Sequence, residues 1–284
     1  MQIDEFSHLM AQHPEVDVLC NEIGKKCGKH FLLSNLYASA RGLILSALYS
    51  QLQKKQPYTL LITLDNADDA QYMYADLRTL IGEQDVYFLP SSHRKRQRTD
   101  EALIVQRTEV LSALLRSKEQ GIKIQDKSVK TNRTTQTSHS SIIVTYPEAL
   151  ADSVPNPNAL EANKISLHVG EEIAISTLTD MLLDLHFQRV DFVYEPGQFA
   201  VRGGIVDVYS YAHDIPLRID FFGDEIDSIR EFELETQLSK NKVDSIDIVA
   251  DSTEDDSSCS ILAYLPENTL WISPDFDLLK YKLQ

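Results

Sequence analysis

Residues 194–209 read Tyr194-Glu-Pro-Gly-Gln-Phe-Ala-Val-Arg-Gly-Gly-Ile-Val-Asp-Val-Tyr209, and residues 217–232 read Leu217-Arg-Ile-Asp-Phe-Phe-Gly-Asp-Glu-Ile-Asp-Ser-Ile-Arg-Glu-Phe232. Apolar and polar residues alternate in both blocks, which predicts β-strands with one buried face and one face in water. Gly223-Asp224 predicts a turn that returns residues 225–232 beside residues 217–222. We expect residues 199–209 to form one strand, in which Gly203-Gly204 allows a bulge or a close backbone approach.

The polar face of these expected strands carries a candidate docking patch. Alternation places Arg218, Asp220 and Phe222 on the face opposite the apolar residues, and Arg202 joins them if the strands are neighbours. Arginine and aromatic side chains contribute much of the binding energy at protein interfaces. The alternative is a cross-strand arginine–aspartate pair on a solvated face, which contributes less than about 1 kcal/mol.

The charge of the chain argues against DNA as the partner. Its 284 residues include 27 lysines and arginines against 43 aspartates and glutamates, for a net charge of −16. Binding to the DNA backbone requires a positive surface, because phosphate neutralisation supplies most of the affinity. The densest basic cluster, residues 93–98, follows an expected strand at the edge where α/β folds bind ligands, but a solvated loop is the favoured explanation of it. A protein partner is therefore favoured.

The sequence also indicates the cellular compartment in which the protein is expected. No run approaches the roughly 18 apolar residues that span a bilayer, and the N-terminus lacks the basic start and apolar block of a signal peptide. Cys20, Cys27 and Cys259 form no metal-ligand or redox spacing. We expect a cytoplasmic protein with no membrane partner and no metal site.

Residues 1–162 alternate between strand and helix patterns. Buried parallel strands are predicted at four short apolar runs, residues 31–33, 59–63, 86–89 and 142–145. Helices are predicted between them at residues 43–53, 68–81 and 101–116, the second of them capped by Asp65 or Asn66. This alternation predicts an α/β domain with helices on both faces of the sheet. The Lys-, Ser- and Thr-rich residues 119–140 predict a flexible insertion.

The pattern changes near residue 163. A strand at 165–169, a helix at 175–185 and the two opening blocks predict a small α+β domain. Residues 261–265 and 270–272 then predict a strand-turn-strand unit, and a helix begins at 275. We therefore divide the chain into segments 1–162, 163–246 and 247–284. The abrupt end in that helix leads us to expect a piece of a longer protein.

The chemistry of a nucleotide site is missing where an α/β domain would hold it. A phosphate loop needs glycines whose N–H groups hold the phosphates, a lysine, and a Ser or Thr hydroxyl on magnesium. The expected first strand is followed by Ser34-Asn-Leu-Tyr-Ala-Ser-Ala-Arg-Gly-Leu43, which has one glycine and no lysine. The eight histidines share no motif with a serine or cysteine. We predict no catalytic and no cofactor-binding residues here.

The two opening blocks resemble a module shared by the UvrB excision-repair subunit and the transcription-repair coupling factor (Mfd) family. The resemblance is carried by Gly197-Gln-Phe199, Arg202-Gly203, Asp207-Val-Tyr209, Arg218-Ile-Asp220, Phe221-Phe222, Asp224-Glu-Ile226 and Arg230. It is strongest over residues 187–235 and weaker at 142–150 and 264–268. The coupling-factor family fits better, because UvrB keeps an intact phosphate loop and an aromatic-rich hairpin.

The resemblance implies a degenerate helicase-like (RecA/UvrB-type) parallel-sheet α/β domain in two segments, with a small inserted α+β domain. In the family the inserted domain docks onto UvrA, the damage sensor of nucleotide excision repair. The residues that match this docking surface are Arg202, Arg218, Asp220 and Phe222. We expect Arg202→Glu and Arg218→Glu to abolish UvrA binding without changing the thermal melt.

The resemblance further implies that this region is a non-catalytic module without a cofactor. RNA polymerase and double-stranded DNA, as well as ATP and magnesium for a translocase, would belong to domains beyond residue 284. The alternative is a helicase-like nucleotidase or a UvrB-type damage-binding subunit that acts on DNA directly.

Overall fold

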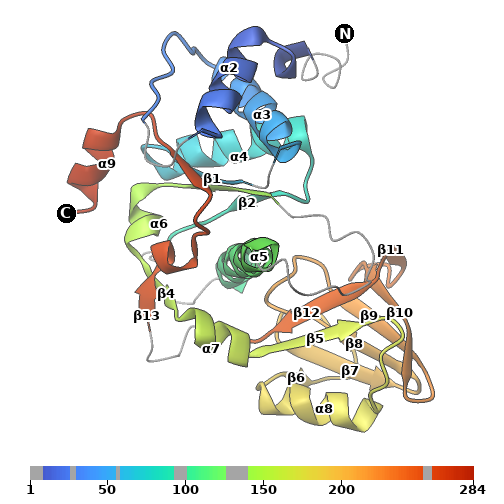
Figure 1. Cartoon of the computed structure of the whole chain (residues 1–284). Helices are drawn as coiled ribbons and strands as arrows, with labels where there is room; N and C mark the ends of the chain where they lie inside the picture. The colour runs from blue at the N-terminus through green and yellow to red at the C-terminus, as the bar shows by residue number, and fades with distance from the viewer. Residues whose placement is uncertain (1–8, 26–29, 56–57, 93–100, 126–139, 252–257) are drawn as a thin grey trace. The chain divides into compact units, whose positions relative to one another are not determined.

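The computed structural model of the chain describes residues 9–25, 30–55, 58–92, 101–125, 140–251 and 258–284. The chain forms two compact units (Figure 1). Unit 1 comprises residues 1–90, 113–151 and 264–284, and unit 2 comprises residues 91–112 and 152–263. The boundaries predicted at residues 162 and 246 follow the change of sequence pattern and stay a prediction.

Unit 1 is built on a parallel sheet of four strands in the order β14-β1-β3-β2. The strands are β1 (Thr59–Thr63), β2 (Val86–Phe88), β3 (Ser141–Thr145) and β14 (Thr269–Ile272). Every residue of β1 and β3 is buried, as expected for apolar runs covered on both faces of a parallel sheet. Because β14 comes from the far end of the chain, two separate segments build this sheet, which confirms the predicted fold class.

The helices of unit 1 include α2 (Pro14–Ile23), α3 (Ala40–Gln53), α4 (Ala67–Ile81), α6 (Pro147–Ala151) and α9 (Phe276–Lys282). Three of them, α3, α4 and α9, lie where the sequence predicts them, whereas α2 and α6 were not predicted. Asn66 caps α4, since its side chain accepts a hydrogen bond of 2.9 Å from the backbone N–H of Asp69, as N-cap residues do. None of the helices in the described part of the chain is long and apolar enough to cross a membrane.

Helix α5 (Glu101–Gln125) corrects part of the predicted insertion. It continues nine residues past its predicted end at 116, so residues 119–125 are helical. The rest of that insertion up to residue 139, and the basic cluster 93–98, lie outside the described residues.

Two of the predicted strands are absent from the structure. Residues 31–33 form no strand, and Leu32 is 92% exposed. The apolar run is only three residues long, and Asn35 and Ala38 follow it with φ angles of 62° and 47°, which interrupt an extended backbone. Residues 261–264 form a 3₁₀ turn, η1 (Ile261–Tyr264), that buries Ile261 and Tyr264. A short apolar run therefore does not separate a strand from a buried turn.

Unit 2 is dominated by a six-stranded sheet in the order β11-β10-β9-β8-β7-β6, so each strand lies beside its neighbours in sequence. All contacts are antiparallel except the one between β6 and β7. The strands are β6 (Gln188–Arg189), β7 (Gln198–Arg202), β8 (Ile205–Val208), β9 (Leu217–Phe222), β10 (Glu225–Phe232) and β11 (Ser239–Val243).

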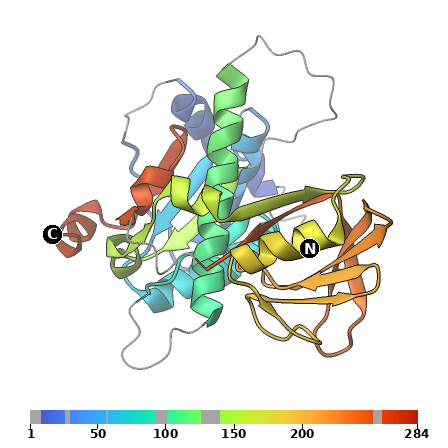
Figure 2. The same ribbon diagram turned by 90° about the horizontal axis from the view of Figure 1, so that it is seen from below.

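One face of this sheet forms the core of unit 2. Helix α8 (Ile175–Asp184) and the antiparallel pair of β5 (Lys164–His168) and β12 (Ser245–Val249) pack against it (Figure 2). The predicted boundary at residue 246 falls inside β12, which pairs along its whole length with β5. Smaller elements complete the unit: β4 (Ser153–Pro155), α7 (Pro157–Ala162) and β13 (Ser258–Ser260), which pairs with β4.

Residues 199–209 form a hairpin of β7 and β8, where a single strand was predicted. The chain turns at Gly203, whose φ of 61° lies in the left-handed region that glycine adopts without strain. The predicted close backbone approach occurs at Gly204, whose carbonyl accepts a hydrogen bond of 2.8 Å from the N–H of Phe221. A Cβ at Gly204 would lie 3.1 Å from the carbonyl oxygen of Phe221.

Candidate protein-binding site

The candidate site lies on the outward face of the six-stranded sheet, opposite the core. Directly paired residues of antiparallel strands point to the same face. One row of paired residues on the outward face consists of Ala200, Asp207, Arg218, Arg230 and Lys242, and the next row consists of Arg202, Ile205, Asp220 and Ser228. Phe222 follows on the same face, paired with Glu225. The predicted placement of all four candidate residues on one face is confirmed.

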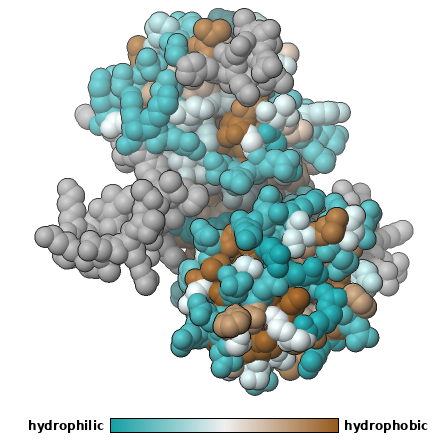
Figure 3. Space-filling model, turned by 90° about the vertical axis from the view of Figure 1, so that its right-hand side faces the viewer, coloured by the Kyte–Doolittle hydropathy of each residue, from teal (hydrophilic) through white to brown (hydrophobic). Residues whose placement is uncertain are grey.

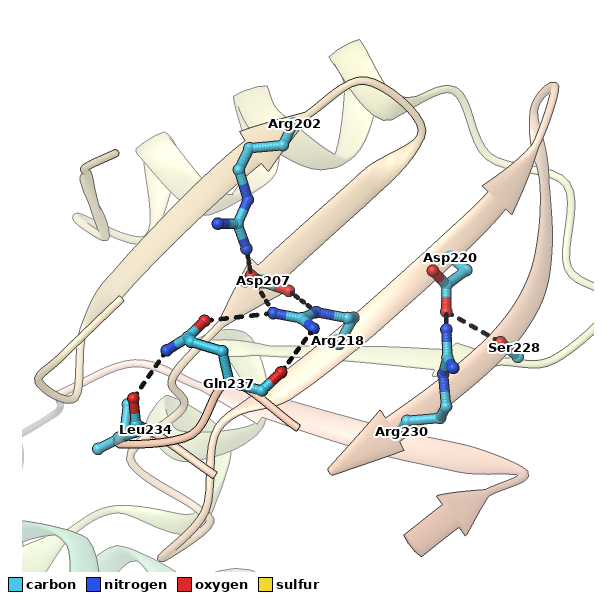
Figure 4. A network of polar contacts seen from close by, with 8 residues as sticks. All are labelled: Arg202, Asp207, Arg218, Asp220, Ser228, Arg230, Leu234 and Gln237. Carbon is cyan, nitrogen blue, oxygen red and sulfur yellow. Dashed lines mark hydrogen bonds and ion pairs between the residues drawn. The ribbon is translucent and has the colours of Figure 1, made fainter. Parts of the chain in front are cut away.

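Asp207 is the centre of the site, although the prediction did not include it. Its side chain is 2% exposed, yet two arginines from neighbouring strands contact its carboxylate (Figure 4). Arg218 donates from Nε to Oδ1 at 2.7 Å and from Nη2 to Oδ2 at 3.0 Å. Arg202 donates from Nη2 to Oδ2. The buried carboxylate is thereby paired and hydrogen-bonded, as a buried charge must be.

Arg218 is held from several directions. Its Nη1 donates to the backbone carbonyl of Gln237 at 3.2 Å, and its guanidinium carbon lies 4.5 Å from the ring centre of Phe232. The hydrogen bonds to Asp207 raise the pKa of Arg218 above its usual range, against the lowering effect of burial. With only 14% of its side chain exposed, Arg218 is a fixed, permanently charged part of the sheet.

Asp220 is turned toward its neighbours on β10. Its Oδ2 accepts a hydrogen bond of 3.0 Å from the hydroxyl of Ser228 and an ion-paired hydrogen bond from Arg230 (Figure 4). The side chain of Asp220 is 19% exposed, whereas that of Arg230 is 32% exposed. The more accessible charge of this pair is therefore the arginine, a residue that the prediction left out.

Aromatic side chains supply the exposed apolar part of the site. Phe222, at the end of β9, is 80% exposed. A second aromatic, Phe192, is about half exposed and lies under Arg202, whose guanidinium carbon is 5.0 Å from the ring centre. In Figure 3 single apolar residues are surrounded by hydrophilic ones on the surface of unit 2. Aromatic residues are enriched at protein interfaces relative to the rest of the surface.

The structure brings the four predicted residues onto one face but divides them by accessibility. Arg218 and Asp220 are mostly covered, while Arg202 and Phe222 reach solvent. Asp207 and Arg230 lie within residues 194–209 and 217–232, the two blocks from which the patch was predicted. The prediction missed them because the alternation of residues does not give the strand register that places them beside Arg218 and Asp220. Phe192 lies outside any alternating pattern, so no sequence signal indicates it.

Other kinds of site find less support. Among the described residues, no group of three histidines, cysteines or carboxylates is placed to hold a metal ion. Residues 34–39 lead into α3 without the glycine-rich loop of a nucleotide site, and Gly42 lies within that helix. The predicted lack of catalytic and cofactor-binding residues stays a prediction.

Comparison with known proteins gives the class of domain first. Residues 165–253 match the family model of the UvrB interaction domain, and this segment contains every residue of the face described above. The chain therefore carries a domain of this class, built on the six-stranded sheet of unit 2.

The chain as a whole is similar to transcription-repair-coupling factors. It is 29% identical over 220 residues to that of Bacillus subtilis (strain 168), which covers 78% of this chain and 17% of the relative. Identity with the factor of Staphylococcus aureus (strain bovine RF122 / ET3-1) is 25% over 224 residues, with the same two coverages. The match to the factor of Staphylococcus aureus (strain USA300) is 39% over 90 residues. The resemblance seen in the sequence is confirmed, and the chain spans about a sixth of the length of these relatives.

Proposed function

We propose that this chain is a non-catalytic docking module that couples transcription to nucleotide excision repair by binding UvrA through the outward face of unit 2. The UvrB interaction domain at residues 165–253 and the similarity to coupling factors support a role in repair coupling. The observation that carries the proposal is Phe222, a large apolar side chain left 80% exposed on the same face of the sheet as the two arginines that contact Asp207.

The geometry suits a protein partner because its charged groups are pre-organised. Arg202 and Arg218 both contact the buried carboxylate of Asp207, so little side-chain freedom remains to be lost when a partner binds. An exposed aromatic on the same face as these arginines offers an apolar anchor to a pocket of the partner, and aromatic residues are among those that dominate interface energies.

The remaining activities implied by the resemblance are proposed for other parts of a longer protein. RNA polymerase and double-stranded DNA would bind there, and ATP with magnesium would drive a translocase. The similarity covers only 17% of the relatives, so none of these activities is assigned to the residues described here.

The sharpest test is Phe222→Ala, compared with Tyr72→Ala as a matched control. Tyr72 is a 75% exposed aromatic on α4 in unit 1, so both changes remove a solvated ring and neither opens a cavity. We expect Phe222→Ala to weaken UvrA binding by about tenfold or more, as truncation of an interface hot spot does. Tyr72→Ala should change it by less than about twofold. Wild-type affinity in Phe222→Ala would contradict the proposal.

The charge reversal at Arg218 is a poorer test than the sequence led us to expect. In the wild type, Nε of Arg218 lies 2.7 Å from Oδ1 of the buried Asp207. Arg218→Glu would therefore place a second carboxylate beside that of Asp207. We therefore expect a lower thermal melt for this variant, so a loss of binding would not distinguish a docking residue from a folding defect. Arg202, whose side chain is 36% exposed, is the more tolerant of the two arginines.

A further inference from the structure

The row of residues that contains Asp207 and Arg218 continues beyond the predicted patch. Strand pairing places Arg230 of β10 directly beside Arg218, and Lys242 of β11 directly beside Arg230. Three cations therefore stand side by side on one face of three consecutive strands. Directly paired side chains on a sheet are close neighbours, and like charges in such positions repel one another.

The carboxylates of this face neutralise the charges of some cations in the row but not of others. Asp207 is shared by Arg202 and Arg218, and Asp220 pairs with Arg230. Lys242 is exposed and forms no ion pair with any residue that the structure describes, whereas Lys240 on the same strand pairs with Glu233 at 3.1 Å. The uncompensated positive charge of this row therefore lies on β11, at Lys242. It stands out because the net charge of the chain is −16.

The terminal Nη groups of Arg230 keep donors for a second acceptor, whereas its Nε is buried. A guanidinium carries five N–H donors in a planar fork, and Asp220 accepts from Nη2 of Arg230. About a third of the Arg230 side chain remains exposed. The ion pair with Asp220 holds the guanidinium group of Arg230 in a fixed orientation, which reduces the entropy lost when that group binds another carboxylate.

We propose that Arg230 and Lys242 extend the docking face across β10 and β11 and bind carboxylate side chains of the partner protein. This inference rests on the proposed function, and it specifies the chemistry of the partner surface, which is acidic opposite this end of the sheet. Phe222 provides the apolar anchor. The row of cations orients the partner on the sheet and raises the association rate, as complementary charges at an interface do.

The proposed role of Lys242 in docking must be distinguished from a structural role. Lysines on edge strands hinder unwanted strand pairing, and β11 is an edge strand of the sheet. That role predicts a change in self-association of the isolated protein. The docking role predicts a change in UvrA affinity at a concentration where the protein is monomeric.

The experiment measures the affinity of UvrA for the wild type and for Lys242→Glu, with Lys280→Glu as control. Lys280 is an exposed lysine on α9 in unit 1, so both variants change the net charge equally. At low salt we expect Lys242→Glu to weaken binding by about fivefold and Lys280→Glu by less than about twofold. The difference should shrink at about 1 M salt, where charges are screened within roughly 3 Å.

Arg230→Lys provides a second measurement, because it keeps the charge and removes the fork. We expect it to weaken binding by about threefold, since a bidentate contact is lost. Equal affinities for Lys242→Glu and Lys280→Glu, together with wild-type affinity for Arg230→Lys, would overturn the inference. If Phe222→Ala still weakens binding by about tenfold or more in that case, the proposed function stands without this inference. If the wild type does not bind UvrA, the proposed function itself fails.

Discussion

Asp207 lies directly opposite Arg218 on the neighbouring strand, and two hydrogen bonds of 2.7 and 3.0 Å join their side chains. Burying a carboxylate is costly unless its charge is paired and its lone pairs are used. Arg202 completes this requirement from the other side. The pair therefore acts as a structural support for the outward face, while Arg202, Arg230 and Phe222 present its accessible surface.

Asp207→Ala is expected to destabilise the protein strongly. Arg218 would remain mostly buried without its carboxylate, and loss of one partner of a buried pair costs about 3 kcal/mol or more. Asp220→Ala is the control, because Arg230 reaches solvent and a loss of about 1 kcal/mol is expected. Urea unfolding curves followed by circular dichroism measure both values. Equal losses would show that Asp207 has no special structural role.

Gly197→Ala should destabilise the protein more than Gly170→Ala. Both glycines have a positive φ, of 81° and 83°, so both changes strain the backbone by about 1 kcal/mol. A Cβ at Gly197 would also lie 2.8 Å from the hydroxyl oxygen of Tyr211, whereas a Cβ at Gly170 meets nothing within 4 Å. The difference between the two melting temperatures isolates the steric part. Identical melts would mean that Tyr211 moves freely aside.

Magnesium-ATP is expected to leave the melting temperature unchanged. A ligand that binds only the folded state raises stability according to its concentration and affinity. Residues 34–43 offer one glycine and no lysine to the phosphates, and Tyr37 is exposed there. A thermal-shift titration with magnesium alone as reference tests this expectation. A rise of several degrees would favour the helicase-like nucleotidase over the docking module.

Stability should fall in alkaline solution, partly through Tyr49. Burial and the nearby charge of Asp85 raise the pKa of Tyr49 far above its usual value, so the folded state keeps a proton that the unfolded state loses. This contribution is intact below about pH 10, the ordinary pKa of tyrosine, and is lost as the pH rises further.

Tyr49→Phe separates this effect from other alkaline titrations. The variant loses the hydrogen bond of 2.9 Å to the carbonyl of Ser140, which costs about 1 kcal/mol near neutral pH. Above pH 10 its unfolding free energy should fall less steeply than that of the wild type, by up to about 1.4 kcal/mol per pH unit. Parallel curves for the two proteins would exclude Tyr49 as a source of the slope.

The sequence predicts the outward face well because alternation alone determines it. Arg218, Asp220 and Phe222 lie where their spacing places them, since side chains on a strand alternate between faces. Register is a different kind of information. The pairing of Asp207 with Arg218, and of Arg230 with Lys242, depends on a bulge and on turn lengths that alternation does not contain.

Short segments mark the other limit of prediction. Residues 31–33 have the composition of a buried strand but only three residues, and left-handed backbone at Asn35 and Ala38 follows. Residues 199–209 have a continuous alternation that hides the turn at Gly203, because the pattern continues on both sides of the hairpin. In both places the local backbone, which the apolar pattern does not encode, determined the structure.

The pairing of β14 with β1 has a consequence for synthesis of the chain on the ribosome. Thr59 and Thr269 are partners in one parallel ladder, so a nascent chain exposes that edge of β1 until residue 272 has emerged. The strands of the six-stranded sheet are neighbours in sequence, and local pairings of this kind form faster than distant ones. We expect the antiparallel sheet to fold first, during translation, while the parallel sheet waits for its last strand. A ribosome arrested before that point would display an unpaired β-edge, the kind of surface that chaperones protect.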